Sequence, residues 1–144
     1  MEFIQAREDE GQSLAEIRAI SMKPSLIALG RFDESRVRNR FLEKFDPKNT
    51  YKIMLNNELI GFYATTDKDD HLYLNHLYIL PQFQRKGCGG SVITHIKSKA
   101  SSSGKPIRLG ALRGSDSNFF YLKHGFVKTH EDEFDIYYQF NQVS

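Results

Sequence analysis

The segment LYILPQFQRKGCGGSVI, residues 77–93, contains the clearest change of structure in the chain. An apolar run stops at Pro81, two cations (Arg85 and Lys86) precede a cluster of glycines, and an apolar pattern then resumes. This order predicts a strand, a glycine-rich turn and a helix. A helix N-terminus leaves several N–H groups unpaired and carries a partial positive charge, to which the two cations add. The segment therefore predicts a site for an anion.

Other interpretations of this turn are open at this point. Glycine turns also serve simply to reverse the chain, and a bare G-x-G is weak evidence for a ligand. The segment contains no G-x-x-x-x-G-K-[ST], so it is not a Walker loop. It also lacks the G-x-G-x-x-G of a dinucleotide fingerprint, which follows the first strand of its unit.

Periodicity on both sides of the turn predicts a mixed α/β fold in a single domain spanning residues 1–144. Residues 71–80 have apolar side chains on both alternating faces, which is typical of a central strand. A right-handed β-α-β crossover is expected from residue 72 to 112. Strands are predicted at 2–7, 50–55, 59–66, 71–80, 106–112, 126–130 and 134–140, and helices at 13–22, 33–45, 87–100 and 115–125.

Composition narrows the function classes. Twenty Lys plus Arg against eighteen Asp plus Glu give a net charge of +2, which is too balanced for non-specific nucleic-acid binding. The single cysteine, Cys88, excludes an internal disulfide and favours a reducing compartment. The charged start MEFIQAREDE does not resemble a signal peptide, and no stretch approaches 18 apolar residues. A soluble, cytoplasmic protein that does not bind membranes is expected.

Two motifs carry a family resemblance. LYILPQFQRKGCGGSVI resembles the coenzyme A loop of the GNAT acetyltransferase superfamily, whose pattern Q/R-x-x-G-x-G/A is filled by Gln84, Gly87 and Gly89. SDSNFFYLKHGF (115–126) resembles the second hallmark of that family, an Asn followed by Tyr and then Gly-Phe. The similarity covers roughly residues 50–140. It implies a mostly antiparallel sheet flanked by helices, in which a splayed parallel strand pair holds acetyl-CoA.

The resemblance also implies which residues hold the cofactor. Main-chain groups of the central strand would bind the pantetheine arm, and the N–H groups of the glycine loop would bind the pyrophosphate, with the Ser91 hydroxyl nearby. Asn118 corresponds to the family's cofactor-bonding Asn, Phe120 would lie against the cofactor, and Lys123 would reach a phosphate. The predicted cofactor-binding residues are Leu77, Tyr78, Ile79, Gln84, Arg85, Lys86, Gly87, Cys88, Gly89, Gly90, Ser91, Asn118, Phe120, Tyr121 and Lys123.

For catalysis, the resemblance implies a general acid but leaves the general base open. Tyr121 matches the tyrosine that protonates the departing sulfur, and a phenol with a pKa of about 10 stays protonated at neutral pH. Family members often have a Glu where Asn75 stands, and Asn cannot take a proton. His76 is a candidate base and Asn75 a candidate water-ordering residue. On a strand the two side chains point to opposite faces, and the sequence does not choose between them. No metal is expected, because the histidines form no ligand motif.

These observations predict an N-acetyltransferase that moves the acetyl group of acetyl-CoA directly to a primary amine of a small molecule, peptide or protein. A non-catalytic acyl-CoA sensor or partner module is the main alternative, and a longer acyl-CoA donor is another. A nucleic-acid interaction through the basic segment 31–44 is a third, although Asp33, Glu34 and Glu43 interrupt its charge. The apolar strand FDIYYQF would allow a homodimer.

Overall fold

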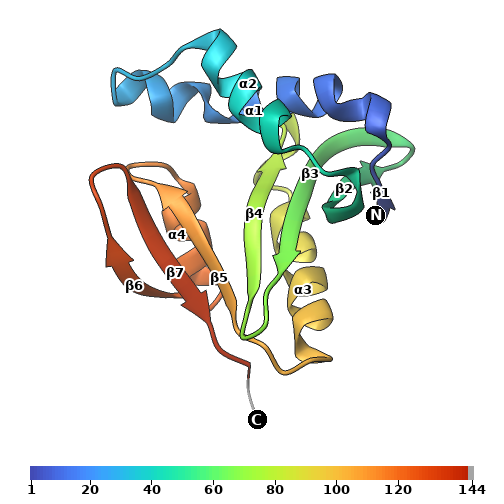
Figure 1. The fold of residues 1–144 in the computed structure, drawn as a ribbon, viewed down its shortest axis with the longest axis vertical. Helices are drawn as coiled ribbons and strands as arrows, with labels where there is room; N and C mark the ends of the chain where they lie inside the picture. Colours follow the sequence, from blue (N-terminus) through green and yellow to red (C-terminus); the bar gives the residue numbers. More distant parts are fainter. Residues whose placement is uncertain (143–144) are drawn as a thin grey trace. The chain divides into compact units, whose positions relative to one another are not determined.

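The computed structural model describes residues 1–142 of the chain, shown as a ribbon in Figure 1. The strands are β1 (Glu2–Gln5), β2 (Thr50–Leu55), β3 (Glu58–Asp67), β4 (Leu72–Ile79), β5 (Ile107–Leu112), β6 (Val127–Glu131) and β7 (Asp135–Phe140). The α-helices are α1 (Gly11–Ala28), α2 (Glu34–Lys44), α3 (Cys88–Ser101) and α4 (Ser117–Lys123), and short 3-10 turns occupy Glu8–Glu10, Pro47–Asn49 and Pro81–Phe83. The predicted order of helices and strands is confirmed.

The strands are hydrogen-bonded in the order β1-β2-β3-β4-β5-β7-β6, with β4 in the interior of the sheet as predicted. β1–β2, β2–β3, β5–β7 and β6–β7 pair in antiparallel fashion. β4 and β5 pair in parallel, with Leu72 opposite Ile107 and Tyr73 opposite Arg108. The predicted fold class, a mostly antiparallel sheet with one parallel pair and flanking helices, is confirmed.

The chain divides into two compact units. Unit 1 contains residues 1–64 and 76–86, and unit 2 contains residues 65–75 and the chain from Gly87 onward. The division falls within β4: from His76 this strand belongs to unit 1, whereas its parallel partner β5 belongs to unit 2. The glycine loop is divided in the same way, after Lys86.

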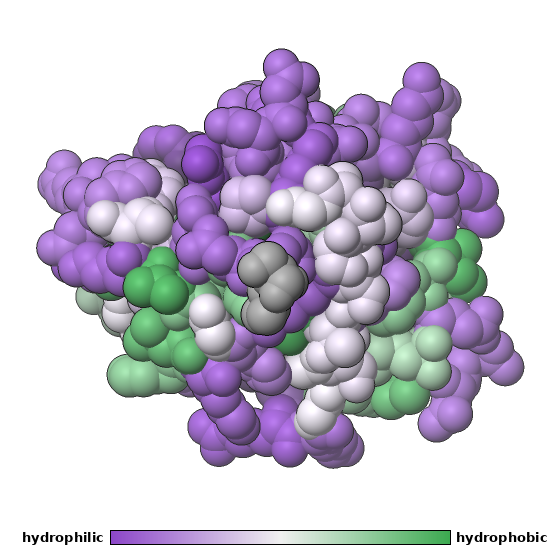
Figure 2. Space-filling model, turned by 90° about the horizontal axis from the view of Figure 1, so that it is seen from below, coloured by the Kyte–Doolittle hydropathy of each residue, from purple (hydrophilic) through white to green (hydrophobic). Residues whose placement is uncertain are grey.

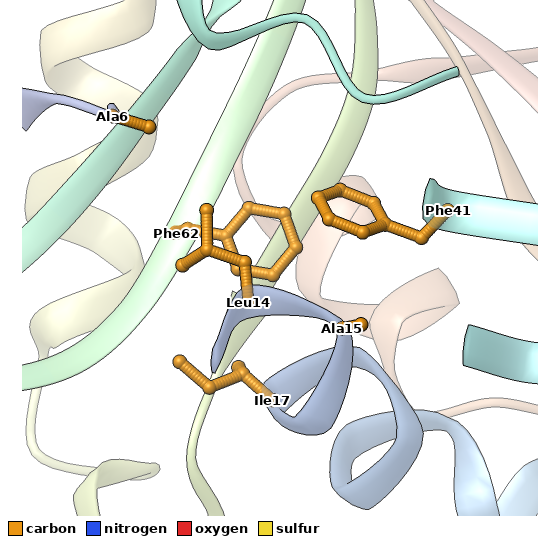
Figure 3. Packing of buried hydrophobic residues seen from close by; sticks show 6 residues of the cluster. All are labelled: Ala6, Leu14, Ala15, Ile17, Phe41 and Phe62. Carbon is orange, nitrogen blue, oxygen red and sulfur yellow. The ribbon is translucent and has the colours of Figure 1, made fainter. Parts of the chain in front are cut away.

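The core of unit 1 is formed where α1 and α2 pack on β3. Phe41 of α2 and Phe62 of β3 have ring centroids 5.2 Å apart, and both side chains are almost fully buried. Leu14 and Ile17 of α1 complete the contact, with Leu14 in front of the Phe62 ring in Figure 3. The three-residue spacing of these α1 residues is the apolar stripe that predicted the helix.

Two local features of unit 1 follow from particular residues. Asn56 and Asn57 have φ angles of 51° and 64°, so the β2–β3 hairpin closes through two left-handed residues, a conformation that Asn tolerates well. Helix α1 is longer than predicted: it continues past Pro24 to Ala28, where the sequence pattern ended the helix at residue 22. Leu26 is buried beyond the proline, and this packing offsets the hydrogen bond that a proline removes.

In unit 2, α4 packs on β5 and β7. Ile107, Leu109 and Ala111 form the buried face of β5, and Tyr138 that of β7. Gly125, with a φ of 87°, follows α4, as expected for a helix stop. The molecular face in Figure 2 is mostly hydrophilic, with hydrophobic residues in separate patches. Among the described residues, no helix is both long and apolar enough to cross a membrane.

Candidate active site

The glycine loop leads into α3 through two residues with left-handed backbone conformations. Gly87 is the N-cap of α3 and adopts a left-handed φ of 79°, and Arg85 is left-handed as well, with a φ of 64°. A left-handed non-glycine residue costs about 1–2 kcal/mol, and such strain is concentrated at ligand sites. The first intrahelical bond of α3 runs from Ser91 N to Gly87 O at 3.2 Å. The N–H groups of residues 88–90 therefore lack an intrahelical acceptor, and no acidic side chain occupies the first turn.

Two side chains of this loop are exposed cations, and two others are hydrogen-bonded to main-chain carbonyls. Arg85 and Lys86 are exposed, and the Lys86 ammonium lies 5.9 Å from the centre of the Phe83 ring. Gln84 donates from Nε2 to the carbonyl of Ile79 at 2.8 Å, which ties the loop back to the end of β4. The Ser91 hydroxyl lies 3.2 Å from the Gly87 carbonyl, to which it donates.

The three glycines of the loop have different roles. A Cβ on Gly87 would meet nothing within 4 Å, so this position requires glycine for its conformation alone. A Cβ on Gly89 would lie 2.9 Å from the Phe120 ring, and one on Gly90 would lie 3.2 Å from His124. The missing side chains of Gly89 and Gly90 therefore let α4 pack closely on the first turn of α3, a reason that the sequence interpretation did not include.

The second motif lies on α4, where Asn118 is only 8% exposed. Its Nδ2 donates to the carbonyls of Leu112 at 3.0 Å and Ser115 at 2.9 Å, and its Oδ1 accepts from the Tyr138 hydroxyl at 2.8 Å. Both amide hydrogens are thus used within unit 2, and one lone pair of Oδ1 remains for a ligand. Asn118 thus joins α4 to β5 and β7.

Tyr121, the predicted acid, lies on the same helix and is 7% exposed. Its ring packs edge-on against Phe120 and Phe126, with centroids 5.3 and 5.4 Å away, and at 6.3 Å from Tyr138. These rings fix the orientation of the phenol. Lys123, at the end of α4, is exposed. Cys88 opens α3 and is buried.

The predicted site residues of β4 from His76 onward lie in unit 1, whereas Asn75 lies in unit 2. His76 is packed against the rings of Phe41 and Phe62, at centroid distances of 5.3 and 6.1 Å. Its Nδ1 lies 3.2 Å from the Tyr78 hydroxyl. Burial, with a smaller contribution from the Arg18 charge, lowers the pKa of His76 to about 4. The imidazole is therefore neutral at pH 7 and is a weak base.

Asn75 and His76 have different surroundings, as the alternation of a strand requires. Asn75 belongs to unit 2 and is exposed, and its Oδ1 accepts from the Thr66 hydroxyl at 2.8 Å. Its Nδ2 can donate to a water molecule, but the amide cannot accept a proton. The side chain at position 75 is thus an amide, where the resemblance predicts a Glu.

Beyond His76, the backbone of β4 lies in close contact with the backbone of β3. A Cβ on Gly61 of β3 would lie 2.1 Å from the Tyr78 carbonyl oxygen, so the two strands approach there to a distance that excludes any side chain. Leu80 N donates to the Ile60 carbonyl at 2.8 Å. The carbonyl of Ile79 accepts from Gln84, and Leu77 is half-buried.

Sequence reasoning did not identify Arg18, a residue of α1 that contacts Tyr78 and whose charge adds to the effect of burial in lowering the pKa of His76. Its Nε lies 3.4 Å from the Tyr78 hydroxyl, and it donates from Nη1 to the Val37 carbonyl. The Tyr78 hydroxyl in turn lies 3.5 Å from the Met22 sulfur, to which it donates. Arg18 is four residues after the buried Leu14 and therefore lies on the apolar face of α1. A charged residue on this face is the sequence feature that could have identified it.

Comparison with known proteins identifies the family. The model of the acetyltransferase (GNAT) domain matches residues 19–136, well over half of the chain. The chain therefore belongs to the GNAT acetyltransferase family, and the predicted resemblance is confirmed. Among curated proteins, none matches the chain significantly.

Solved structures share the fold. The PaiA N-acetyltransferase from Thermoplasma acidophilum, in complex with coenzyme A, is 20% identical over 98% of both chains, with a TM-score of 0.80. The ribosomal-protein-S18-alanine N-acetyltransferase from Escherichia coli is 14% identical over 97% of this chain and 92% of its own, with a TM-score of 0.73. A GNAT family acetyltransferase from Elizabethkingia anophelis with acetyl-CoA bound is 21% identical over 65% of this chain and 75% of its own, with a TM-score of 0.58. At these sequence identities, each comparison shows a shared fold.

Proposed function

We propose that the protein is an N-acetyltransferase that moves the acetyl group of acetyl-CoA directly to a primary amine of a small molecule, peptide or protein. The glycine loop carries the proposal: a left-handed Gly87 opens α3, and Arg85 and Lys86 add two exposed cations. Relatives with the same fold were solved with coenzyme A or acetyl-CoA bound, which supports the choice of donor. One relative is by its description an N-acetyltransferase of a protein alanine, which supports an amine acceptor.

The residues predicted to hold the cofactor fit an anionic ligand. The N–H groups of residues 88–90 and the cations Arg85 and Lys86 would bind the pyrophosphate, and exposed Lys123 would reach a further phosphate. Gln84 would act by holding the loop to the end of β4, since its amide is bonded to the Ile79 carbonyl. Bound acetyl-CoA would supply the acetyl group as a thioester.

Tyr121 would be the general acid. Its ring is fixed by its aromatic neighbours, so its hydroxyl would be held in one orientation and would donate a proton to the departing sulfur. A main-chain N–H of residues 77–79 would stabilise the oxyanion, a preorganised dipole of the kind that dominates many acyl transfers.

A water molecule ordered by Asn75 would take the amine proton and pass it on to the bulk solvent. His76 is a poor candidate, because a base with a pKa of about 4 is badly matched to neutral pH. Asn75 is exposed, so its Nδ2 can donate a hydrogen bond to water while its Oδ1 accepts from Thr66. Deprotonation would then depend on the solvent and on the pKa of the amine itself, which favours acceptors of low pKa.

Thermal unfolding with excess acetyl-CoA, ATP or NAD tests the donor. At about 100 times its Kd, a ligand adds roughly 2.7 kcal/mol, or about 5–10 °C in Tm for a chain of this size. We expect a shift with acetyl-CoA that exceeds those with ATP and NAD. Equal shifts, or none up to millimolar acetyl-CoA, would contradict the proposal.

Turnover separates this enzyme from a non-catalytic acyl-CoA-binding module, which the absence of a carboxylate at position 75 favours. Release of free coenzyme A in the presence of a panel of primary amines is the measurement. We expect Tyr121→Phe to reduce kcat about 10²–10⁴-fold while the Tm shift with acetyl-CoA persists. Tyr51→Phe on β2 is the matched control and should leave kcat unchanged. Binding without turnover for every amine would establish the binding module instead.

A further inference from the structure

Unit 2 contains a groove of about 470 Å³ that none of the predicted cofactor or catalytic residues line. Strands β4 to β7 and the residue preceding β4 contribute to it. Its volume is in the range of small-molecule sites, which are commonly 300–1,000 Å³. The side chains that give the groove its chemistry are His71, Tyr73, Arg108, His130, Tyr137 and Gln139.

The groove lies on the face of β5 and β7 that points away from α4. Arg108 and Gly110 alternate with the buried residues of β5, and they pair in register with Gln139 and Tyr137 of β7. Neighbouring Tyr138 points to the opposite face, where its hydroxyl bonds Asn118. Within unit 2, the groove and the second acetyltransferase motif therefore occupy opposite faces of the same strands.

Two tyrosines approach each other over Gly110. A Cβ at this position would lie 2.9 Å from Cε1 of Tyr137 and 3.6 Å from the Tyr73 hydroxyl oxygen. The Tyr137 ring is stacked on His130, with centroids 4.4 Å apart and planes at 8°. The Tyr73 ring stands edge-on to His71 at 6.3 Å. The walls are thus flat and aromatic, a surface that suits a planar ring.

Arg108 supplies a positive charge at one end of the groove. Its Nε donates to Gln139 Oε1 at 2.8 Å, and its Nη1 lies 3.4 Å from Nδ1 of His71. The Gln139 contact orients the guanidinium, whereas Nδ1 of His71 is engaged by Asp70, whose pKa is lowered by the His71 hydrogen bond and also by the Arg108 charge. Within residues 1–142, no carboxylate oxygen lies within 4.0 Å of an Arg108 nitrogen; Asp70 instead bonds His71 at 2.6 Å. An oriented guanidinium without a paired carboxylate is a receptor for a carboxylate ligand.

The other end of the groove limits the charge of the ligand. Asp135 pairs with Leu112, four residues along β5 from Arg108, which places it about 13 Å farther along the strand. Its charge reaches Tyr73, whose pKa is raised by burial and by Asp135. A second anionic group at this end would be repelled, so the groove favours a ligand with one anionic end.

We propose that this groove binds a small aromatic carboxylate, with the carboxylate on Arg108 and the ring against Tyr73 and Tyr137. The site goes beyond acetyl transfer, since none of its residues has been assigned to the donor or to the chemistry. Its ligand is recognised by one charge and one flat face.

Titration of the full chain with 2-naphthoate, followed by amide NMR shifts, tests the site. We expect saturable shifts at Arg108, Tyr137 and Gln139, with at least tenfold weaker binding of uncharged 2-naphthamide and of acetate, which has no ring. Arg108→Gln should weaken 2-naphthoate binding at least tenfold, and Arg108→Lys should lose less. Tyr137→Leu should also weaken it. Arg113→Gln, which removes a cation of unit 2 outside the groove, should leave the Kd within twofold.

Several results would overturn the proposal. Equal affinity for the naphthoate and the amide, or an unchanged Kd in a folded Arg108→Gln variant, would remove the carboxylate site. Competition by excess coenzyme A would show that the naphthoate occupies the cofactor site, so the titration is repeated with coenzyme A present. A dimer by light scattering that Tyr137→Leu converts to a monomer would make the groove an interface between copies of the chain.

Discussion

Unit 1 and unit 2 each have a glycine at a crowded contact, but the neighbours of the two glycines differ in kind. In unit 1, the missing Cβ of Gly61 makes room for a backbone carbonyl, that of Tyr78. In unit 2, the missing Cβ of Gly89 makes room for a side chain, the Phe120 ring. A ring can rotate away from a new methyl group, whereas a carbonyl in a sheet moves only with its strand.

Two polar side chains with little exposure, His76 of unit 1 and Asn118 of unit 2, show a second contrast. His76 of unit 1 is packed among aromatic rings, and its properties come from desolvation. Asn118 of unit 2 is held by three hydrogen bonds to β5, β7 and its own turn. The pKa of His76 is therefore set mainly by its apolar surroundings, whereas the position of Asn118 is set by its hydrogen bonds. These two contrasts predict how strongly substitutions in each unit affect stability.

The largest expected effect is that of Gly61→Ala. Its methyl group would lie 2.1 Å from a backbone oxygen, so β3 and β4 must separate, and we expect a loss of more than about 4 kcal/mol. Gly89→Ala should cost only about 1–3 kcal/mol, because the Phe120 ring can shift. Urea unfolding followed by circular dichroism measures both. Equal losses of stability in the two variants would show that the kind of neighbour, backbone or side chain, does not determine the cost of the added methyl group.

Asn118→Ala comes next, with an expected loss of about 3 kcal/mol. It removes three hydrogen bonds and leaves the buried Tyr138 hydroxyl without its acceptor. Tyr138→Phe is the matched variant, since it removes a single bond and should cost about 1 kcal/mol. A similar cost for both would show that the amide hydrogens of Asn118 contribute little to the stability of unit 2.

His76 should make stability depend on pH. Its pKa is lowered from 6.5 in the unfolded chain to about 4 in the folded protein, so the unfolded state binds the proton first. The contribution is therefore complete above pH 6.5 and is lost as the pH falls toward 4, by up to about 3 kcal/mol. Urea unfolding at pH 7.5, 6.5, 5.5 and 4.5 gives the slope.

His76→Phe identifies the source of this slope. The variant keeps a ring in the aromatic site, and its stability should fall less than that of the wild type between pH 6.5 and 4.5. His95 and His124 also have lowered pKa values, through burial, and they remain in the variant as an internal control. An unchanged slope would assign the pH dependence to these histidines or to the carboxylates with lowered pKa values, such as Glu10 and Glu16.

Gly87→Ala should have the smallest effect. The added methyl group meets no atom within 4 Å, so only the left-handed φ of 79° opposes it, at about 1 kcal/mol. The N–H groups of α3 remain in place, and the Tm shift with acetyl-CoA should persist. A lost shift with little loss of stability would place Gly87 in contact with the ligand.

Features that depend on neighbouring residues could be predicted from the sequence. The β2–β3 hairpin, the interior position of β4 and the helix stop at Gly125 each follow from a local pattern. The pairing of Gly89 with Phe120 does not, because the two residues are 31 positions apart and meet only after folding. The same holds for His76, whose pKa depends on segments that contribute Arg18, Phe41 and Phe62.

The family was predictable from the two motifs, whereas the hydrogen bonds of the candidate site were not. Gln84, Gly87 and Asn118 could be singled out by motif, and the family is confirmed. The internal bonds of Asn118 and Gln84 could not, since they join a side chain to carbonyls whose positions are set by the fold. A motif thus predicts which residues matter, while their hydrogen-bond partners require coordinates.

Pro24 gives α1 an unequal resistance to hydrogen exchange. A proline within a helix has no amide hydrogen to donate to the carbonyl four residues earlier, here Ile20. The turn after it, up to Ala28, is held mainly by buried Leu26, whereas the earlier turns contribute Leu14, Ala15 and Ile17 to the core. In heavy water, the amides of residues 25–28 should become deuterated through local opening, well before those of residues 14–19, which wait for unit 1 to unfold.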